Sequence, residues 1–113
     1  MLVERPQGPY SGGMVNHIVV WKLKDEAEGN TKAVNARLIQ EKLEALKGVI
    51  PGLVSLEVGI NTNPKETAAD VVLRSVHESW AALDAYQVHP QHKAAGDFIG
   101  KVRDDRRCVD WEG

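Results

Sequence analysis

The sequence predicts an α+β domain of ferredoxin-like topology, in which the element order β-α-β-β-α-β builds a four-stranded antiparallel sheet with its helices on one face. Four segments are strand-like, because they are rich in β-branched residues or alternate in polarity, and segments with helical spacing follow the first and the third. No internal repeat or second apolar core is visible. One domain over residues 14–113 is therefore sufficient.

The chain opens its regular pattern with a strand and a helix. Residues 15–23 (VNHIVVWKL) are rich in β-branched and aromatic side chains, and their centre is apolar on both alternating faces. After a polar loop at 24–29, Asn30 or Thr31 can cap a helix that runs to about Lys47. The spacing of its apolar residues is helical, four, three and four apart, at Ile39, Leu43, Leu46 and Ile50.

A second strand follows the helix. Gly48 and Pro51-Gly52 end the helical pattern, because glycine and proline favour helix termination. Residues 53–60 then alternate in polarity, which is typical of a half-buried strand. We expect one side of this strand to carry Val54, Leu56, Val58 and Ile60. Residues 61–69, which include Asn63-Pro64, predict a turn.

The third strand leads into a broken helix. Residues 71–77 are strand-like, and Ser79 is placed to cap a short helix that begins at Trp80. His89-Pro90 interrupts this helix, because a residue before proline is disfavoured in the α region while proline suits a first helical position. A further helix is predicted from about Pro90 to Val102.

The last strand is predicted over Arg106–Trp111 (RRCVDW). Arg106 and Arg107 follow Asp104 and Asp105, and we interpret these four residues as a solvated charge cluster at the start of the strand.

The predicted sheet has an apolar face without helices. Residues 15–23 and 71–73 offer apolar side chains to both faces, although helices cover only one. Two sheets packed face to face in a symmetric homodimer, a dimeric α/β barrel, would bury this surface. The alternative is a monomer with a few exposed valines.

Composition limits the possible partners and compartments. The formal charge is only −2 and no apolar run approaches the roughly 20 residues needed to span a bilayer, so neither nucleic acid nor a membrane is an expected partner. The single cysteine, Cys108, has no internal disulfide partner, which fits a reducing compartment such as the cytoplasm. Residues 1–13 lack the apolar core of a signal peptide and are interpreted as an irregular leader, either added for expression or a native surface arm.

Four sequence elements resemble the stress-responsive A/B barrel family: VNHIVVWKLKDE, IPGL, HESW and AYQVHPQH. The similarity runs from about Met14 to Trp111, and the YxxHPxH spacing is its most specific part. The resemblance implies a dimeric barrel in which two four-stranded sheets face each other. Members of the family include heat-stable plant stress proteins, bacterial proteins of unknown role and a plant polyketide cyclase that works without a cofactor.

His92 and Tyr86 are the first candidates for catalysis. His92 is predicted in the first turn of a helix, where the helix dipole disfavours the charged ring and leaves a neutral imidazole that can act as a general base. The phenol of Tyr86 can donate a hydrogen bond to an oxygen that gains negative charge. The resemblance places the cyclase's catalytic histidine and tyrosine on these two residues, and a pocket histidine on His17.

Further candidates for ligand contact are His89, Val71 and Trp80. The resemblance places a second pocket histidine of the cyclase at Val71, and it gives an apolar residue at the position of His77, so a different substrate is expected. His89 and His92 have a structural alternative, since both can hydrogen-bond to backbone groups at the helix break. The histidine spacing does not favour a metal site, and no cofactor motif is present.

Three functions remain open from the sequence. The first is the binding of a small, partly apolar molecule between the sheet and the helices, with cofactor-free proton transfer or cyclisation next to a carbonyl. The second is a non-catalytic stress-response or oligomeric structural protein. The third follows related dimeric barrels and is a cofactor-free monooxygenase or a haem-binding protein.

Overall fold

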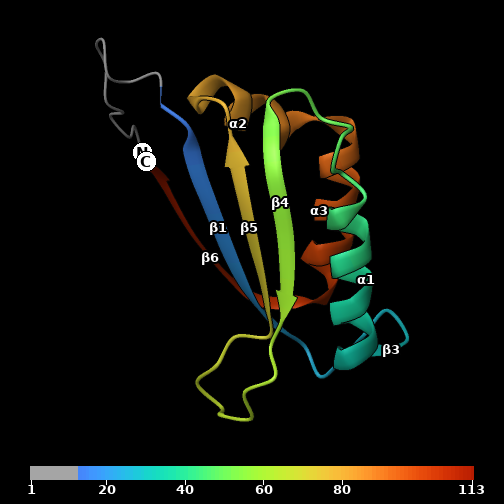
Figure 1. Cartoon of the computed structure of the whole chain (residues 1–113). Helices are drawn as coiled ribbons and strands as arrows, with labels where there is room; N and C mark the ends of the chain where they lie inside the picture. Colours follow the sequence, from blue (N-terminus) through green and yellow to red (C-terminus); the bar gives the residue numbers. More distant parts are fainter. Residues whose placement is uncertain (1–12) are drawn as a thin grey trace.

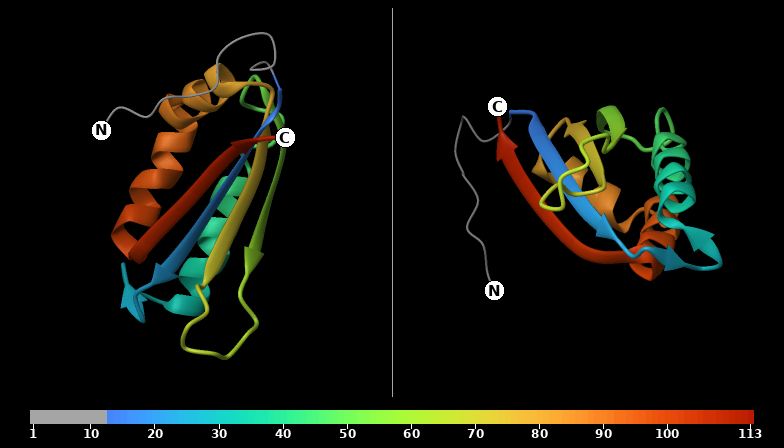
Figure 2. Two further views of the ribbon diagram at one scale, coloured as in Figure 1. Left: turned by 90° about the vertical axis from the view of Figure 1, so that its left-hand side faces the viewer. Right: turned by 90° about the horizontal axis from the view of Figure 1, so that it is seen from below.

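The computed structural model describes residues 13–113 and contains a four-stranded antiparallel sheet of strand order β4-β5-β1-β6 (Figure 1). Its strands are β1 (Val15–Leu23), β4 (Leu53–Ile60), β5 (Val71–His77) and β6 (Arg103–Glu112). The helices α1 (Lys32–Glu44), α2 (Trp80–Val88) and α3 (Pro90–Val102) lie on one side of the sheet (Figure 2). The predicted ferredoxin-like α+β fold is thus confirmed, while the predicted leader, apart from Gly13, lies outside the described residues.

The loop predicted at 24–29 was wrong in part, because residues 26–31 form a small hairpin of β2 (Glu26–Ala27) and β3 (Asn30–Thr31). Glu28 and Gly29 form its two-residue turn with φ of 52° and 76°, the left-handed geometry that tight hairpins require. Thr31 then caps α1 by accepting a hydrogen bond from the backbone N–H of Val34.

α1 ends at Glu44 and not at about Lys47 as predicted. The backbone N–H groups of Leu46 and Lys47 bond to carbonyls three residues earlier, a tighter turn that often closes a helix. Leu46 and Ile50 are nevertheless buried, as their spacing suggested.

The helix break occurs where the sequence places it. Ser79 caps α2 through its hydroxyl oxygen, which accepts from the backbone N–H of Ala82 at 3.0 Å. His89 is extended, with ψ of 134°, and Pro90 is the first residue of α3. This break turns the chain between Tyr86 and His92, so that both residues can face the sheet.

The core lies between the sheet and the helices. Alternate residues of β1 are buried, and so are alternate residues of β5. On these two strands the buried residues are Val15, His17, Val19, Trp21, Leu23, Val71, Leu73, Ser75 and His77. Three of them are polar side chains at the His17 and His77 end of the sheet, and this local concentration of polar groups marks the candidate site.

The start of β4 differs from the prediction. The register of β4 against β5 shifts between Leu53 and Ser55, so a bulge interrupts the alternation. Val54 is consequently 49% exposed, although Leu56 and Val58 on the same predicted side are buried.

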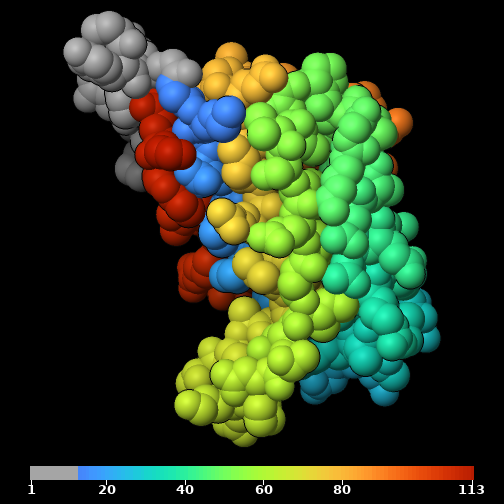
Figure 3. All heavy atoms as spheres, viewed as in Figure 1, coloured from blue at the N-terminus to red at the C-terminus, as the bar shows by residue number. Residues whose placement is uncertain are grey.

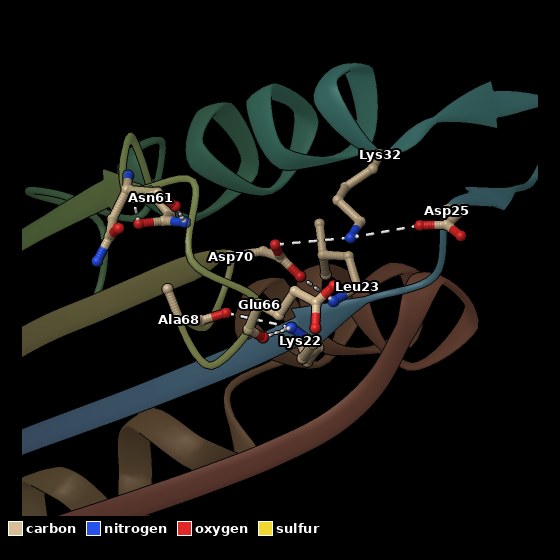
Figure 4. A network of polar contacts seen from close by, with 9 residues as sticks. Lys22, Leu23, Asp25, Lys32, Asn61, Glu66, Ala68 and Asp70 are labelled. Atoms are coloured by element: carbon tan, nitrogen blue, oxygen red, sulfur yellow. Dashed lines mark hydrogen bonds and ion pairs between the residues drawn. The ribbon is translucent and has the colours of Figure 1, made fainter.

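The connection between β4 and β5 is tied to the end of β1 (Figure 4). Lys22 Nζ donates to the carbonyl oxygens of Glu66 and Ala68, at 2.9 and 3.2 Å. The Asp70 carboxylate accepts from the backbone N–H of Leu23 at 2.7 Å. These bonds provide partners for backbone carbonyls of the loop and for a backbone N–H at the end of β1.

The face of the sheet opposite the helices is apolar in its centre. It carries Ile18, Val20, Val72 and Val76, which alternate with the buried positions of β1 and β5, and also Val109 and Trp111 of β6, which pair with Ile18 and Asn16. Figure 3 shows the strands at the surface of the molecule on this side. Among the described residues, no helix has the length and apolar character needed to cross a membrane.

Gly52 provides a test of how closely α2 packs at the end of the sheet. Its φ is +85°, and a Cβ at this position would lie 2.7 Å from Cβ of Ala82 in α2. We therefore expect Gly52→Ala to lower the free energy of unfolding by about 2–5 kcal/mol, from left-handed strain plus overpacking. Gly29→Ala, which meets no atom within 4 Å at a similar φ, should cost only about 1–2 kcal/mol. Equal losses in urea unfolding would contradict the packing argument.

Candidate active site

Four aromatic side chains from four elements converge at the helix side of the sheet. Tyr86 of α2 has its ring centroid 4.3 Å from that of His92 in α3 and 4.7 Å from that of His77 in β5. His17 of β1 completes the group at 6.2 Å from Tyr86. The structure thus brings together three of the predicted site residues, His17, Tyr86 and His92, and adds His77.

His17 is paired with a carboxylate. It lies directly opposite Asp110 in the register of β1 and β6, and its Nδ1 donates a hydrogen bond to Asp110 Oδ1. The imidazole is 1% exposed, so this bond fixes both its orientation and its tautomer. In the neutral ring, Nε2 then carries the lone pair.

His92 is a second imidazole with a fixed tautomer. Its Nδ1 donates to the carbonyl oxygen of Gln87 at 3.2 Å, which leaves Nε2 as the basic nitrogen. Burial lowers the pKa of His92 below its usual 6.5, and the neighbouring His17, Arg106 and His89 lower it further, while the bond to Gln87 acts in the opposite direction. The ring is therefore neutral near pH 7.

His77 and Tyr86 form the buried interior of the cluster. Burial lowers the pKa of His77 to about 4, with His17 as a further cause. Its Nε2 lies 2.9 Å from the hydroxyl of Ser75, whereas Nδ1 has no partner among residues 13–113. Burial raises the pKa of Tyr86, so its fully buried hydroxyl stays protonated, and within the same residues it too has no partner.

A pocket of about 160 Å³ opens beside the cluster, between β1, β6 and α3. His17 and His92 form part of its lining. Gly96 and Gly100 follow His92 on the same face of α3 at intervals of four residues, and a Cβ at either position would meet open space. The other lining residues are Val19, Trp21, Leu43, Leu73, Ile99, Arg103 and Arg106.

Arg106 adds to one interpretation of the sequence. It is exposed, as expected of a solvated charge, and it also lines the pocket and lowers the pKa of His92. Arg107 does fit that interpretation, since it pairs with Asp105 at 3.4 Å. Asp110, Arg103 and Arg106 were all missed as site residues. Only the strand register shows that they share a face with His17.

The remaining candidates lie away from the cluster. His89 caps α3, with Nδ1 accepting from the N–H of Gln91 at 3.2 Å, which is the structural role considered for it. Trp80 donates through Nε1 to Glu112 at 2.6 Å. Val71 is buried opposite Trp21 and borders a hollow of about 270 Å³ near the β4–β5 loop.

Metal ligands do not gather in the described part of the chain. Over residues 13–113, no group of three or more His, Cys, Asp or Glu side chains is arranged to hold a metal ion. The pairing of His17 with Asp110 and of His92 with a backbone carbonyl leaves one basic nitrogen on each ring, an arrangement suited to proton transfer.

The sequence model of the stress responsive A/B barrel domain matches residues 15–113, which is nearly the whole described chain. The chain belongs to this family. No curated protein sequence gives a significant match.

Solved structures of the same fold include members of unknown function. A dimeric protein of unknown function with a ferredoxin-like fold from Bacteroides fragilis has a TM-score of 0.80 at 36% identity, over 92% of this chain and 100% of that chain. A dimeric ferredoxin-like protein of unknown function from Thermobifida fusca has a TM-score of 0.78 at 22% identity, over 96% and 100%. The hydroxynitrile lyase of Passiflora edulis has a TM-score of 0.75 at 13% identity, over 90% and 94%, a likeness of fold alone.

The buried His77 of this A/B barrel domain makes stability depend on pH. Between pH 6.5 and about 4 the unfolded chain binds a proton at His77 that the folded chain does not, so the free energy of unfolding falls as the pH falls. The full loss from this residue is about 3 kcal/mol. We expect urea unfolding at pH 7.5 and 4.5 to show a smaller loss in His77→Gln than in the wild type. His89→Gln, which removes a half-buried ring, should keep the wild-type loss, and an undiminished loss in His77→Gln would contradict the assignment.

Proposed function

We propose that this protein binds a small, partly apolar carbonyl compound in the pocket beside His92 and catalyses cofactor-free proton transfer at the carbon next to the carbonyl. The observation that carries the proposal is the pair of pocket imidazoles, His17 and His92, each with its Nδ1 bonded and its Nε2 left basic. A general base of this kind typically gives about 10²- to 10⁴-fold acceleration.

In the proposed reaction, His92 Nε2 removes the proton and the electron pair of the broken C–H bond moves into an enolate. Tyr86 is assigned as the donor to the enolate oxygen, because its buried hydroxyl is beside His92 and has no partner among the described residues. This role requires the carbonyl oxygen to reach past the His92 ring. The enolate then either takes a proton back or attacks a second carbonyl, and in the second case the new alkoxide takes the proton from His92.

His17 and Asp110 form the second proton-transfer group of the proposal. The carboxylate holds Nδ1, so Nε2 is the nitrogen through which the imidazole would exchange a proton with a ligand. The lining also suits a partly apolar ligand, as it combines polar groups with Val19, Leu43 and Leu73.

A purely structural role explains less of the site. Buried polar groups without partners each cost about 1–3 kcal/mol, and a core selected only for stability would replace them. His77 Nδ1 and the Tyr86 hydroxyl are two such groups. Neither side chain lines the pocket, so within this proposal a ligand completes them only by reaching past the His92 ring.

We further propose a homodimer formed by the helix-free face of the sheet. The Bacteroides fragilis relative, at 36% identity, is described as dimeric, as is the Thermobifida fusca protein. In this chain the same face carries exposed apolar residues, among them Val72, Val109 and Trp111.

The catalytic assignment is tested by the exchange of carbon-bound protons for deuterium in D₂O, followed by NMR on small enolisable ketones. We expect His92→Ala to slow the protein-dependent exchange about 10²- to 10⁴-fold. In the wild type the rate should fall as the pH drops through the pKa of His92, which lies below 6.5. His89→Ser is the control at pH 7.5, where His92 is neutral in either variant, because serine also caps a helix and should leave the rate there unchanged. Full activity of His92→Ala with an intact fold would exclude His92 as the base.

The proposed dimer is tested by placing a charge in the centre of the helix-free face. Val72→Glu should shift the protein from dimer to monomer in sedimentation velocity at micromolar concentration, because a buried unpaired carboxylate is strongly unfavourable. Val88→Glu, which changes a 69% exposed valine at the end of α2, should remain dimeric. A wild-type protein that sediments as a monomer would refute the dimer directly.

A further inference from the structure

We infer that the pocket takes a substrate that carries a carboxylate, which Arg103, Arg106 and the indole N–H of Trp21 hold at the end of the pocket away from His17. This inference rests on the proposed function, because it names the substrate class for the same pocket. The chemistry indicated is that of a small keto acid, with its carboxylate at the arginines and its carbonyl toward the imidazoles.

A bulge places both arginines on the pocket side. Arg106 pairs with Trp21 and Arg103 pairs with Leu23, and both partners are buried on the helix side of β1. In a regular strand, residues three apart face opposite sides of the sheet. Because the register shifts between Lys22 and Leu23, Arg103 and Arg106 face the same side of the sheet. Bulges commonly redirect a side chain next to a functional site.

The positive charges of these arginines are not neutralised by the described chain. Over residues 13–113, neither Arg103 nor Arg106 has a carboxylate within the 4 Å of an ion pair. Their neighbours are paired, since Arg107 contacts Asp105 at 3.4 Å and Lys101 contacts Glu28 at 3.7 Å. A guanidinium offers the paired donors that match the two oxygens of a carboxylate.

Trp21 supplies an independent observation at the same end of the pocket. Its side chain lines the pocket, is 4% exposed, and has an indole N–H with no partner among the described residues. A buried donor normally has a partner, so this one calls for an acceptor that the described chain does not provide. A carboxylate bound by Arg106 beside it would provide that acceptor.

The dimensions limit the size of the substrate. A dry cavity of about 150 Å³ holds a molecule the size of benzene, and this pocket has about 160 Å³. His17 and Trp21 are separated by about 13 Å along β1, and the long arginine side chains shorten the gap between the two ends. A short chain or a single ring therefore fits between the carboxylate and the reacting carbonyl.

The test compares 4-oxopentanoate with its methyl ester, because both have exchangeable protons beside a ketone and only the acid carries a charge. Dissociation constants are measured by NMR titration of the full-length protein, and deuterium exchange is measured on the same samples. The wild type should bind the acid more tightly than the ester. Arg106→Gln and Arg103→Gln should each weaken binding of the acid about ten- to a hundredfold and leave binding of the ester unchanged. Arg106→Lys should retain part of the preference.

Arg107→Gln is the matched control, since it removes the same charge one residue away, on the opposite face of β6. Equal affinity for acid and ester in the wild type, or an equal loss in Arg107→Gln, would overturn the inference. Preferential binding of the acid without any exchange would support the carboxylate site and refute the proposed proton transfer. Equal affinity for the acid and the ester, together with equal exchange of both, would refute the carboxylate site and support the proposed proton transfer.

Discussion

The pairing of β1 with β6 determines what the pocket contains. This register sets Asp110 opposite His17 and Arg106 opposite Trp21, although the paired residues are far apart in the sequence. The bulge at Lys22 and Leu23 then brings Arg103 to the same side. A slip of one residue would send every side chain of β6 to the other face, and the imidazole of His17 would lose its carboxylate. The chemistry of the site therefore depends on strand pairing more than on any single helix.

Three buried polar groups on the helix side of the sheet are costly to the folded state. The hydroxyl of Tyr86, Nδ1 of His77 and the indole N–H of Trp21 lack partners within residues 13–113. At about 1–3 kcal/mol each, they subtract several kcal/mol from a total stability that is typically 5–15 kcal/mol. Gly96 and Gly100 weaken α3 by up to about 1 kcal/mol each, relative to alanine, on the face that borders the pocket. Departures of this kind are concentrated at functional sites, and the rest of the structure offsets their cost.

Much of the fold could be predicted from local patterns, because the physical causes are local. Thr31 and Ser79 cap helices where the sequence places them, and His89-Pro90 breaks the helix at the predicted residue. The wrong predictions for the strands arose because the pairing between strands determined their structure there and the alternation of polar and apolar residues did not. A bulge exposes Val54, and the first strand residue after α3 is Arg103, not Arg106.

Only those residues of the candidate site could be predicted whose type and place in the sequence by themselves indicate a chemical role. His17, Tyr86 and His92 come together in the structure, and the histidines and the tyrosine are recognisable by type and by their place around a proline. Asp110 and the two arginines look like ordinary surface charges of a terminal strand. No nearby residue in the sequence indicates which side chains they contact, because β1 and β6 come together only when the segments between them have folded. For the same reason His77 was considered only as a departure from a pattern, and not as a member of the cluster.

The two faces of β1 separate the two properties proposed for this protein. Ile18 and Val20 point to the helix-free face, while His17, Val19 and Trp21 point to the pocket. Because strand side chains alternate, association and ligand chemistry can vary independently on one strand. Proteins of unknown function and a hydroxynitrile lyase share this fold, so the sheet itself does not specify an activity. In this chain the specific information lies on the pocket side, in two oriented imidazoles at one end and, at the other, two guanidinium groups that form no ion pair within residues 13–113.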